Sequence, residues 1–325
     1  MEQARPPVDT GDLATDAIAW FDRHARDLPW RPPAPGRHIE APHPQPHAGW
    51  AVLVSEVMLA QTPVNRVTDA WLAWMHRWPT PADLAASSAA DAIRAWGRLG
   101  YPRRALRLHA AATVITTQFG GEVPSRLDAL LALPGVGSYT ARAVSAFAYR
   151  QRHPVVDTNV RRLLHRAVDG QAQAAAATTN KDLERAAALL PASANRAARA
   201  SAALMELGAL VCTARKPRCD ECPVLARCAW QRAGNPPRTA PPPRPSQRYQ
   251  GTDRQVRGLL LAVLRDSTQP VPAHRLDIVW PQPVQRRRAL AGLVADGLVS
   301  ITHDDRYALA DEGGLDSGTA DLEPS

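Results

Sequence analysis

Two acidic residues of this 325-residue chain stand alone beside apolar stretches. Apolar surroundings can shift the pKa of a carboxyl group. Glu56 is the only charged residue in the run WAVLVSEVMLAQ, over 50–61. If that helix buries Glu56, desolvation raises its pKa and keeps the proton that a general acid needs; an exposed helix edge is the alternative. Asp157 follows the apolar residues 154–156 and opens the helical pattern TNVRRLLHR. A helix N-cap explains Asp157 equally well, and the two roles are compatible.

A glycine-containing turn precedes the second acid. The residues LPGVG, over 133–137, place Gly135 and Gly137 one residue apart, and a helical pattern resumes at Ser138. Backbone N–H groups at such a helix start point outward, and glycine removes the side chains that would block a phosphate. The turn therefore indicates a phosphate cradle, with an ordinary helix–helix connection as the alternative.

Four cysteines form a compact C-x6-C-x2-C-x5-C run. They are Cys212, Cys219, Cys222 and Cys228. Thiolates at this spacing can hold an iron–sulfur cluster or zinc, and the spacing alone does not decide between them. Three basic residues lie between the first two cysteines: Arg215, Lys216 and Arg218. We expect these three to contact phosphate beside the metal site.

The composition favours a polyanionic partner. The formal net charge is +8, carried almost entirely by arginine, since Lys181 and Lys216 are the only lysines. The start, MEQARPPVDTG, has no apolar signal core, and no long uncharged apolar run suggests a membrane span. We therefore expect a cytoplasmic protein with no membrane partner. In that reducing compartment the cysteines favour a metal site over disulfides.

Apolar residues at helical spacing predict a mainly α-helical chain. The expected helices cover 11–24, 50–61, 65–75, 80–86, 89–96 and 105–118, one begins at Ser138, one at Asp157, and Ala-rich helices fill 183–213. Tyr101 stands at the tip of a Gly-rich turn flanked by arginines, just before one of these helices. Such an aromatic residue can wedge between stacked bases while the arginines meet phosphates. A tyrosine that only packs against a helix is the alternative.

The C-terminal part has a different pattern. A Pro-rich linker over 231–249 leads to helical patterns at 253–265, 272–279 and 284–295 and to short strands at 298–302 and 306–309. Three helices and a hairpin predict a small winged-helix-like domain over 250–310. Residues 311–325 are acidic and Gly-rich, which is typical of a disordered tail. Near the other end, the Pro-rich segment with His38, Glu40, His43 and His47 is expected to be a solvated loop and not a metal site.

Several motifs together resemble the MutY-type adenine DNA glycosylases, of the helix–hairpin–helix, iron–sulfur base-excision repair superfamily. They are L-P-W-R over 28–31, S-E-V-M-L-x-Q-T over 55–62, W-x-x-L-G-Y-x-x-R-A over 96–105, the glycine turn followed by Asp157, and the cysteine run. The resemblance covers about residues 11–230. It implies a two-domain helical glycosylase fold, with a six-helix domain over 51–156 that carries the helix–hairpin–helix. The second domain, from 11–50 and 157–230, would hold a [4Fe–4S] cluster.

The same resemblance implies a role for each candidate residue. Glu56 would protonate the adenine, and ionised Asp157, positioned by Asn159, would stabilise the oxocarbenium-like sugar, as in two-carboxylate glycoside hydrolysis. DNA contacts would come from Arg31, Gln61, Tyr101, Gly135, Gly137, Arg162 and the basic residues of the cysteine loop. Tyr139 stands where bifunctional relatives carry a Schiff-base lysine, so base removal without strand cleavage is implied. The sequence departs from the family pattern at Ala60, Pro102 and Thr158.

The implied function is a monofunctional DNA glycosylase that removes adenine mispaired with 8-oxoguanine or guanine in base-excision repair of DNA damage. A nucleoid-associated monomer acting on double-stranded DNA is expected. A thymine glycosylase for T·G mismatches and a non-enzymatic iron–sulfur DNA-binding protein remain as alternatives, and the missing lysine disfavours an endonuclease III-type lyase.

The family's usual NUDIX-like C-terminal domain is lacking. The basic residues Arg286, Arg287 and Arg288 predict salt-sensitive binding by the domain that replaces it, with a structural cap as the alternative.

Overall fold

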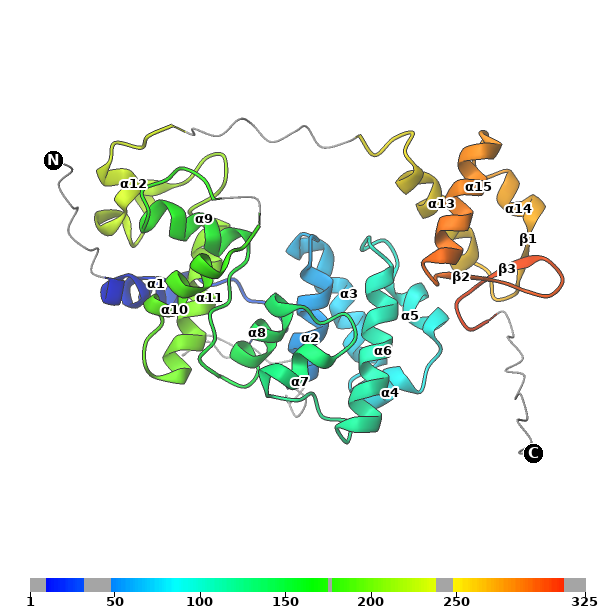
Figure 1. The fold of residues 1–325 in the computed structure, drawn as a ribbon, viewed down its shortest axis with the longest axis horizontal. Coiled ribbons are helices and arrows are strands. Elements are labelled where there is room, and N and C mark those ends of the chain that lie inside the picture. The colour runs from blue at the N-terminus through cyan, green and yellow to red at the C-terminus, as the bar shows by residue number, and fades with distance from the viewer. Residues whose placement is uncertain (1–9, 32–47, 175–176, 238–247, 313–325) are drawn as a thin grey trace, which may run out of the picture. The chain divides into compact units, whose positions relative to one another are not determined.

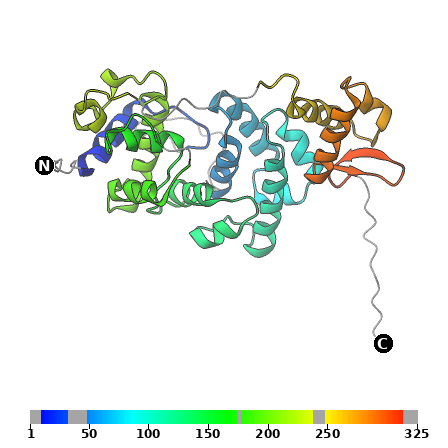
Figure 2. The ribbon, with the colours of Figure 1, turned by 45° about the horizontal axis from the view of Figure 1, so that its top comes forward.

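The computed structural model describes residues 10–31, 48–174, 177–237 and 248–312. Most of the expected Pro-rich loop, linker and acidic tail therefore lies outside the described residues. Contacts divide the chain into two compact units, one of Met1–Ala60 with Glu122–Pro243 and the other of Gln61–Gly121 with Arg244–Ser325. The domain bounds expected from the sequence stay a prediction. Helices dominate both units (Figures 1 and 2), and none of the described helices is long and apolar enough to cross a membrane.

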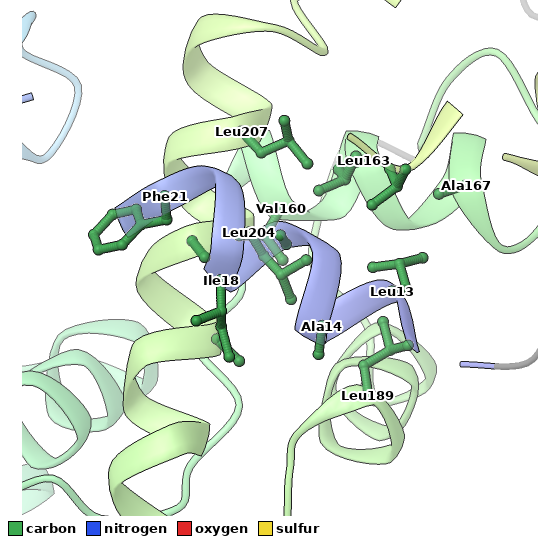
Figure 3. Packing of buried hydrophobic residues seen from close by; sticks show 14 of the residues in the cluster. Leu13, Ala14, Ile18, Phe21, Val160, Leu163, Ala167, Leu189, Leu204 and Leu207 are labelled. Carbon is green, nitrogen blue, oxygen red and sulfur yellow. The ribbon is translucent and has the colours of Figure 1, made fainter. Parts of the chain in front are cut away.

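The core of the first unit is formed by α1 (Thr10–His24), α9 (Thr158–Ala167), α10 (Asn180–Leu189) and α11 (Ala194–Leu210). Each helix turns an apolar stripe inward, as Figure 3 shows for Leu13, Leu163 and Leu204. Alanines on α11 let neighbouring helices approach closely, and large aliphatic side chains fill the remaining space. This core holds the start of α9, where Asp157 lies.

The helix–hairpin–helix lies in the same unit. Helix α7 (Leu127–Ala132) and helix α8 (Ser138–Phe147) flank the turn 133–137, and α8 packs on α2 (Ala48–Leu59). Helix α2 is buried along most of its length, which its largely apolar sequence predicts. Helix α7 was expected only through the resemblance, which implies a helix before the hairpin, because its six residues show no clear helical period.

The cysteine segment follows α11 with little regular structure. It contains two short 3-10 turns, η1 (Cys219–Glu221) and η2 (Leu225–Arg227), and ends in α12 (Ala229–Arg232). Cys212 and Cys228 are buried against the core of the first unit, at its edge beside α9. The segment is held by local turn hydrogen bonds, such as those from Cys222 N to the Cys219 carbonyl and from Cys228 N to the Leu225 carbonyl.

The second unit begins with α3 (Val64–Arg77), α4 (Pro81–Ala85), α5 (Ala89–Trp96) and α6 (Arg103–Gln118). Thr80 and Asp83 form a capping box at the start of α4, with Pro81 at the first helical position. Trp74 contacts Trp78 and Trp96 edge to face, with ring centroids 4.6 and 5.7 Å away. This indole cluster holds the C-terminal end of α5, from which the loop with Tyr101 leaves.

The C-terminal part of the second unit has the order α13 (Asp253–Arg265), β1 (Val271–Pro272), α14 (Ala273–Asp277), α15 (Pro283–Ala295), β2 (Val299–Ile301) and β3 (Arg306–Leu309). The strands form one antiparallel sheet in the order β1-β3-β2, with Val271 opposite Tyr307 and Ser300 opposite Ala308. The predicted helices and hairpin are all present. The added strand β1 is only two residues long, too short to show alternation.

This C-terminal part is not an isolated appendage of its unit. Ala90 and Ile93 of α5 belong to the same buried cluster as Leu261 and Leu264 of α13 and Leu309 of β3. Figures 1 and 2 both show the C-terminal helices and strands beside α5. The two segments of the second unit thus share one hydrophobic core.

Candidate active site and cysteine cluster

Glu56 lies in the buried interior of the first unit, on α2, with only 6% of its surface exposed. Burial raises the pKa of its carboxyl group to about 7, and the negative charge of Asp157 acts in the same direction. A hydrogen bond from Tyr139 and the positive charge of Arg31 oppose that rise. Glu56 is therefore protonated in a large share of molecules at neutral pH, as a general acid must be.

Tyr139 joins α8 to this acid. Burial and the neighbouring carboxylates of Glu56 and Asp157 raise the pKa of its hydroxyl well above the ordinary value. The phenol accordingly keeps its proton and acts as a donor to Glu56. Tyr139 lies in the first turn of α8, directly after the hairpin glycines, so the hairpin also fixes this contact. The tyrosine thus belongs to the acid pair and not only to helix packing.

Asp157 is the N-cap of α9 and accepts three hydrogen bonds. The donors are the backbone N–H groups of Asn159 and Val160, at 2.8 and 2.7 Å, and the Asn159 side-chain amide, at 2.7 Å. Burial raises the pKa of the Asp157 carboxyl, while these donors and the charge of Arg162 oppose the rise. Each of these donors favours the charged form, as does the positive end of the helix dipole. Thr158 begins α9 without positive φ, so this backbone does not require the glycine that the family usually has there.

Arg162 connects the aspartate to the cysteine segment. Its guanidinium donates to Asn159 Oδ1 at 2.9 Å, to the Gly208 carbonyl at 2.6 Å and to the Cys212 carbonyl at 2.7 Å. The expected contact of Arg162 with DNA stays a prediction, and the structure shows its donors turned toward the protein. Asn159, as expected, lies between this arginine and the aspartate.

Gly208 on α11 was missed by sequence reasoning. A Cβ atom placed there would lie 2.7 Å from the Asn159 carbonyl oxygen and 2.8 Å from its carbon, both of them backbone atoms. Only glycine lets α11 approach the first turn of α9 so closely. One glycine among many alanines gives little signal in a single sequence, although helix interiors normally disfavour it.

Arg31 contributes to the site from the segment after α1. Its guanidinium donates to the Glu206 carboxylate at 3.2 Å, and Arg26 makes a second ion pair with the same group at 2.8 Å. Glu206 is 1% exposed, and these arginines hold its pKa at about 2 against the effect of burial. Arg31 is therefore fixed near Glu56, whose pKa its charge lowers. Its expected contact with DNA is not tested by these contacts.

The glycine turn has the geometry of an open anion site. Gly135 has a φ of 75°, a conformation that favours glycine. Gly137 has an ordinary φ of −90°, is exposed, and a Cβ atom there would meet nothing within 4 Å. Neither backbone conformation nor internal packing explains glycine at 137, whereas the close approach of an external group does. No side chain caps the start of α8, so its N–H groups face outward.

The four cysteines line one cavity, together with Leu163, Arg166 and Trp230. Four thiolates around one cavity can each bind a different iron atom of a [4Fe–4S] cluster. The donor set therefore fits the cluster, and the cysteines are the residues that would hold it.

Arg166 was not foreseen as part of this site. It is buried, donates to Cys212 Sγ at 3.4 Å, and lies 4.9 Å from the Trp230 ring centroid. A fixed cation beside a sulfur stabilises thiolate charge. All three basic loop residues, Arg215, Lys216 and Arg218, are exposed. Arg218 pairs with Glu221 at 3.0 Å.

Gln61 and Tyr101, the two candidate base readers, lie in the second unit. Both are exposed and both have positive φ, 62° and 49°, which is uncommon for residues other than glycine. The Thr62 hydroxyl donates to the Leu99 carbonyl at 3.2 Å and accepts from Arg104 at 3.0 Å. These contacts join the two segments and present both side chains outward. Strained, exposed residues of this kind are typical of functional sites.

The cysteine geometry predicts iron in the purified protein. Protein purified without oxygen should be brown and contain iron and sulfide. Cys219→Ser should lose both and weaken DNA binding, because the loop of Arg215 and Lys216 loses its anchor. The control Arg215→Ala should keep its iron while losing some affinity for DNA. Stoichiometric zinc in the absence of iron would contradict the assignment.

Comparisons with known proteins identify the family of the chain. The model of the HhH-GPD superfamily base excision DNA repair proteins matches residues 54–188, and that of the iron–sulfur binding domain of endonuclease III matches residues 212–228. The structure is similar to that of a thermostable thymine-DNA glycosylase, with a TM-score of 0.60 and 24% identity over 69% of this chain and 97% of the other. It is also similar to endonuclease III in a trapped DNA complex, with a TM-score of 0.54 and 20% identity over 69% of this chain and 95% of the other. At these identities the likeness shows the fold alone.

Sequence relatives define the branch of the superfamily. An adenine DNA glycosylase of Mycolicibacterium smegmatis is 54% identical over 299 residues, which cover 92% of this chain and 96% of the relative. One of Mycobacterium tuberculosis is 54% identical over 300 residues, or 92% of this chain and 94% of the relative. The human adenine DNA glycosylase is 39% identical over 65% of this chain and 38% of its own length. The chain therefore belongs to the adenine DNA glycosylases of the HhH-GPD superfamily and carries an iron–sulfur binding domain of the endonuclease III type.

Proposed function

We propose that the protein removes adenine opposite 8-oxoguanine or guanine in double-stranded DNA, as a monomer, and leaves the DNA strand intact. The observation that carries this proposal is the buried pair of Glu56 and Asp157 with Tyr139 between the hairpin and the acids. One carboxyl group has its pKa near 7, while the other is surrounded by donors that favour its charged form. A nucleoid location is part of the same proposal, since that is where the substrate is found.

The first step is protonation of the base. The target adenine is rotated out of the duplex so that its ring reaches the buried acid. Glu56 donates its proton to a ring nitrogen, and the glycosidic bond breaks with its electron pair going to the neutral adenine. Tyr139 remains hydrogen-bonded to the glutamate and stabilises the carboxylate that is left. The base therefore departs as a neutral molecule and not as an anion.

The second step concerns the sugar. Loss of the base leaves an oxocarbenium-like cation, which the Asp157 carboxylate stabilises. Asn159 and the first N–H groups of α9 hold that carboxylate in place, so it needs no rearrangement as the charge develops. Water then adds to the sugar, and Glu56 recovers a proton from solvent. Both acids end as they began.

Recognition of DNA is divided among other segments. We assign phosphate binding to Gly135 and Gly137, whose turn is open to an external group, and to the exposed loop of Arg215 and Lys216. Wedging next to the opposite base is assigned to Tyr101, which is exposed and held in a left-handed conformation. Gln61 is a second candidate for contact with the opposite base.

Excision from defined duplexes tests the proposal. Wild-type protein should release adenine from A·8-oxoguanine and A·G pairs. Glu56→Gln and Asp157→Asn should bind these duplexes yet lose roughly a hundredfold or more in single-turnover rate, because the proton donor or the opposing charge is gone. Glu184→Gln, which changes an exposed acid on α10, is the control and should excise normally. Release of thymine from T·G and not of adenine would support the thymine glycosylase instead.

The pKa of Glu56 predicts the direction of pH dependence. Its acid form is the active one, so the single-turnover excision rate should fall as pH rises through about 7. Tyr139→Phe removes a hydrogen bond that lowers this pKa, so the midpoint of the fall should move to higher pH. A rate that increases from neutral to alkaline pH in the wild type would assign base and not acid catalysis to the site.

The shortage of amines predicts little lyase activity. No lysine precedes Lys181, and Tyr139 occupies the position of the Schiff-base lysine. Borohydride should therefore trap little covalent DNA adduct, and strand breaks should appear only after alkali. Lys216→Arg is the control, since any weak trapping through that exposed amine should vanish. Trapping as efficient as that of a lyase standard would refute monofunctional action.

A further inference from the structure

We propose that Arg265, at the end of α13 in the C-terminal part, is a positioning residue for Tyr101. It fixes the start of the loop that carries the tyrosine, and through this contact the C-terminal part sets discrimination of the base opposite adenine without touching it. The inference rests on the role of Tyr101 in the proposed function. The loop of residues 97–102 is called the Tyr101 loop below.

Side chains hold each carbonyl at the start of the Tyr101 loop. The Gly97 carbonyl accepts from Arg265, and the Arg98 carbonyl accepts from Arg66. The Leu99 carbonyl accepts from the Thr62 hydroxyl at 3.2 Å. Next, the Gly100 carbonyl accepts from the Trp96 indole at 2.9 Å and from Arg104 at 3.0 Å. Of these donors, Arg265 alone comes from the C-terminal part, so it links that part directly to the loop backbone.

The loop backbone needs such support from outside. Gly97, Gly100 and Tyr101 all have positive φ, at 53°, 86° and 49°. For tyrosine this conformation is strained and is kept only where surrounding contacts impose it. Arg265 acts at the first of these residues, where the chain leaves α5. A shift of Gly97 is therefore passed along the loop to the tyrosine ring.

A second contact holds the far side of the loop. Asp296, which follows α15, pairs with Arg103 at 3.2 Å, and Arg103 begins α6 just after the loop. Arg257 of α13 also pairs with Asp296 and keeps its carboxylate in place. The C-terminal part thus contacts the chain on both sides of Tyr101.

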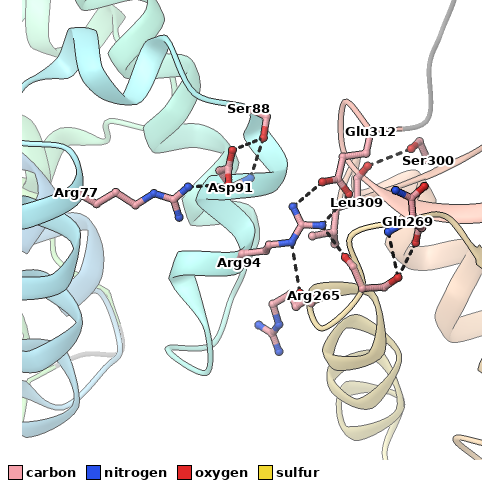
Figure 4. A network of polar contacts seen from close by, with 10 residues as sticks. Arg77, Ser88, Asp91, Arg94, Arg265, Gln269, Ser300, Leu309 and Glu312 are labelled. Atoms are coloured by element: carbon pink, nitrogen blue, oxygen red, sulfur yellow. Dashed lines mark hydrogen bonds and ion pairs between the residues drawn. The ribbon is translucent and has the colours of Figure 1, made fainter.

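The end of α13, which carries Arg265, is itself attached to α5. Arg94 of α5 donates to the carbonyls of Arg265 and Ser267, at 3.3 and 2.8 Å, and pairs with Glu312 at 2.5 Å (Figure 4). Under this polar layer, Ile93 lies in the same apolar core as the leucines of α13. The backbone at Arg265 is therefore held against α5, and its side chain donates to the Gly97 carbonyl at the end of the same helix.

The alternative role of the C-terminal part is to bind DNA phosphates through the arginines of α15. The contacts of these arginines do not favour that role. Arg286 pairs with Asp277 at 2.7 Å, and Arg288 pairs with Asp253 at 2.7 Å. Two of the three consecutive arginines thus have carboxylate partners within the same part of the chain. Arg287, between them, is exposed and provides a control for loss of a single positive charge.

The test combines variants of Arg265 and Tyr101 in the full-length protein. Arg265→Ala should lower the preference for adenine opposite 8-oxoguanine over adenine opposite guanine by up to about tenfold, the usual size of a coupling between contacting residues. Arg265→Lys keeps a donor for the Gly97 carbonyl and should restore much of the preference. Arg287→Ala should have no effect on it. Iron content and the thermal unfolding midpoint of each variant show whether it has folded.

A fluorescent base reports the tyrosine separately from excision. In duplexes with 2-aminopurine beside the opposite base, binding of wild-type protein should raise the fluorescence as Tyr101 unstacks the neighbours. Tyr101→Ala should lose that rise, Arg265→Ala should reduce it, and the double variant should be no worse than Tyr101→Ala alone. If Arg265→Ala does not fold, Asp296→Asn provides the same comparison from the other side of the loop.

The outcomes separate the two proposals. A wild-type protein that raises the fluorescence but releases no adenine would refute the proposed function, while a reduced rise in Arg265→Ala would still support the positioning role. Normal fluorescence and base preference in Arg265→Ala, or additive losses in the double variant, would overturn the positioning role while the glycosylase activity stands. An unchanged signal in Tyr101→Ala would overturn the wedge and, with it, the inference.

Discussion

Two carboxyl groups that lie close together away from water cannot both be ionised without a large penalty, and the fold is arranged to separate their protonation. Donors from the first turn of α9 surround the Asp157 carboxylate and favour its charged form. Glu56 lies buried on α2 beside a tyrosine hydroxyl, and burial raises its pKa to about 7. These two environments support the proposal that Glu56 acts as the acid and Asp157 as the charged carboxylate.

The different protonation of the two acids requires the first turn of α9 to be held in a fixed position. Gly208 brings α11 against the backbone of Asn159, and Arg162 bridges Asn159 to the carbonyls of Gly208 and Cys212. Arg166, one turn further along α9, reaches the sulfur of Cys212. The cysteine segment and Asp157 therefore lie on one continuous set of hydrogen bonds. A cluster that orders this segment also orders the start of α9.

Local signals made part of this arrangement predictable. An isolated acid in an apolar run placed Glu56 either in a buried pocket or at an exposed helix edge, and the structure buries it. An aspartate before a helical pattern predicted the cap at Asp157. Helices α5 and α13 and strand β3 begin and end where their patterns indicated, because each has a clear period between polar boundaries. Such features depend on neighbours in the sequence.

Contacts between segments that are distant in the sequence could not be predicted from local patterns. Nothing in the sequence near Tyr139 indicates that its hydroxyl meets Glu56, and Gly208 is hidden among alanines. The attachment of the C-terminal part to α5 was also missed, because Ile93 looks like the inward face of any amphipathic helix. The expected DNA contacts of Arg31 and Arg162 stay predictions, since their observed partners lie within the protein.

The shared core of α5 and the C-terminal part has a consequence for synthesis on the ribosome. The chain emerges from its N-terminus, so α5 is made long before α13 and β3, which complete its core. Leu106 of α6 packs against this cluster early, but the leucines of α13 and β3 that complete it are made only after the whole cysteine segment. Exposed apolar faces of nascent chains are where chaperones bind and where aggregation starts. The core that α5 shares with α13 and β3 stabilises the folded protein. It also means that α5 is fully buried only after the C-terminal part has been synthesised.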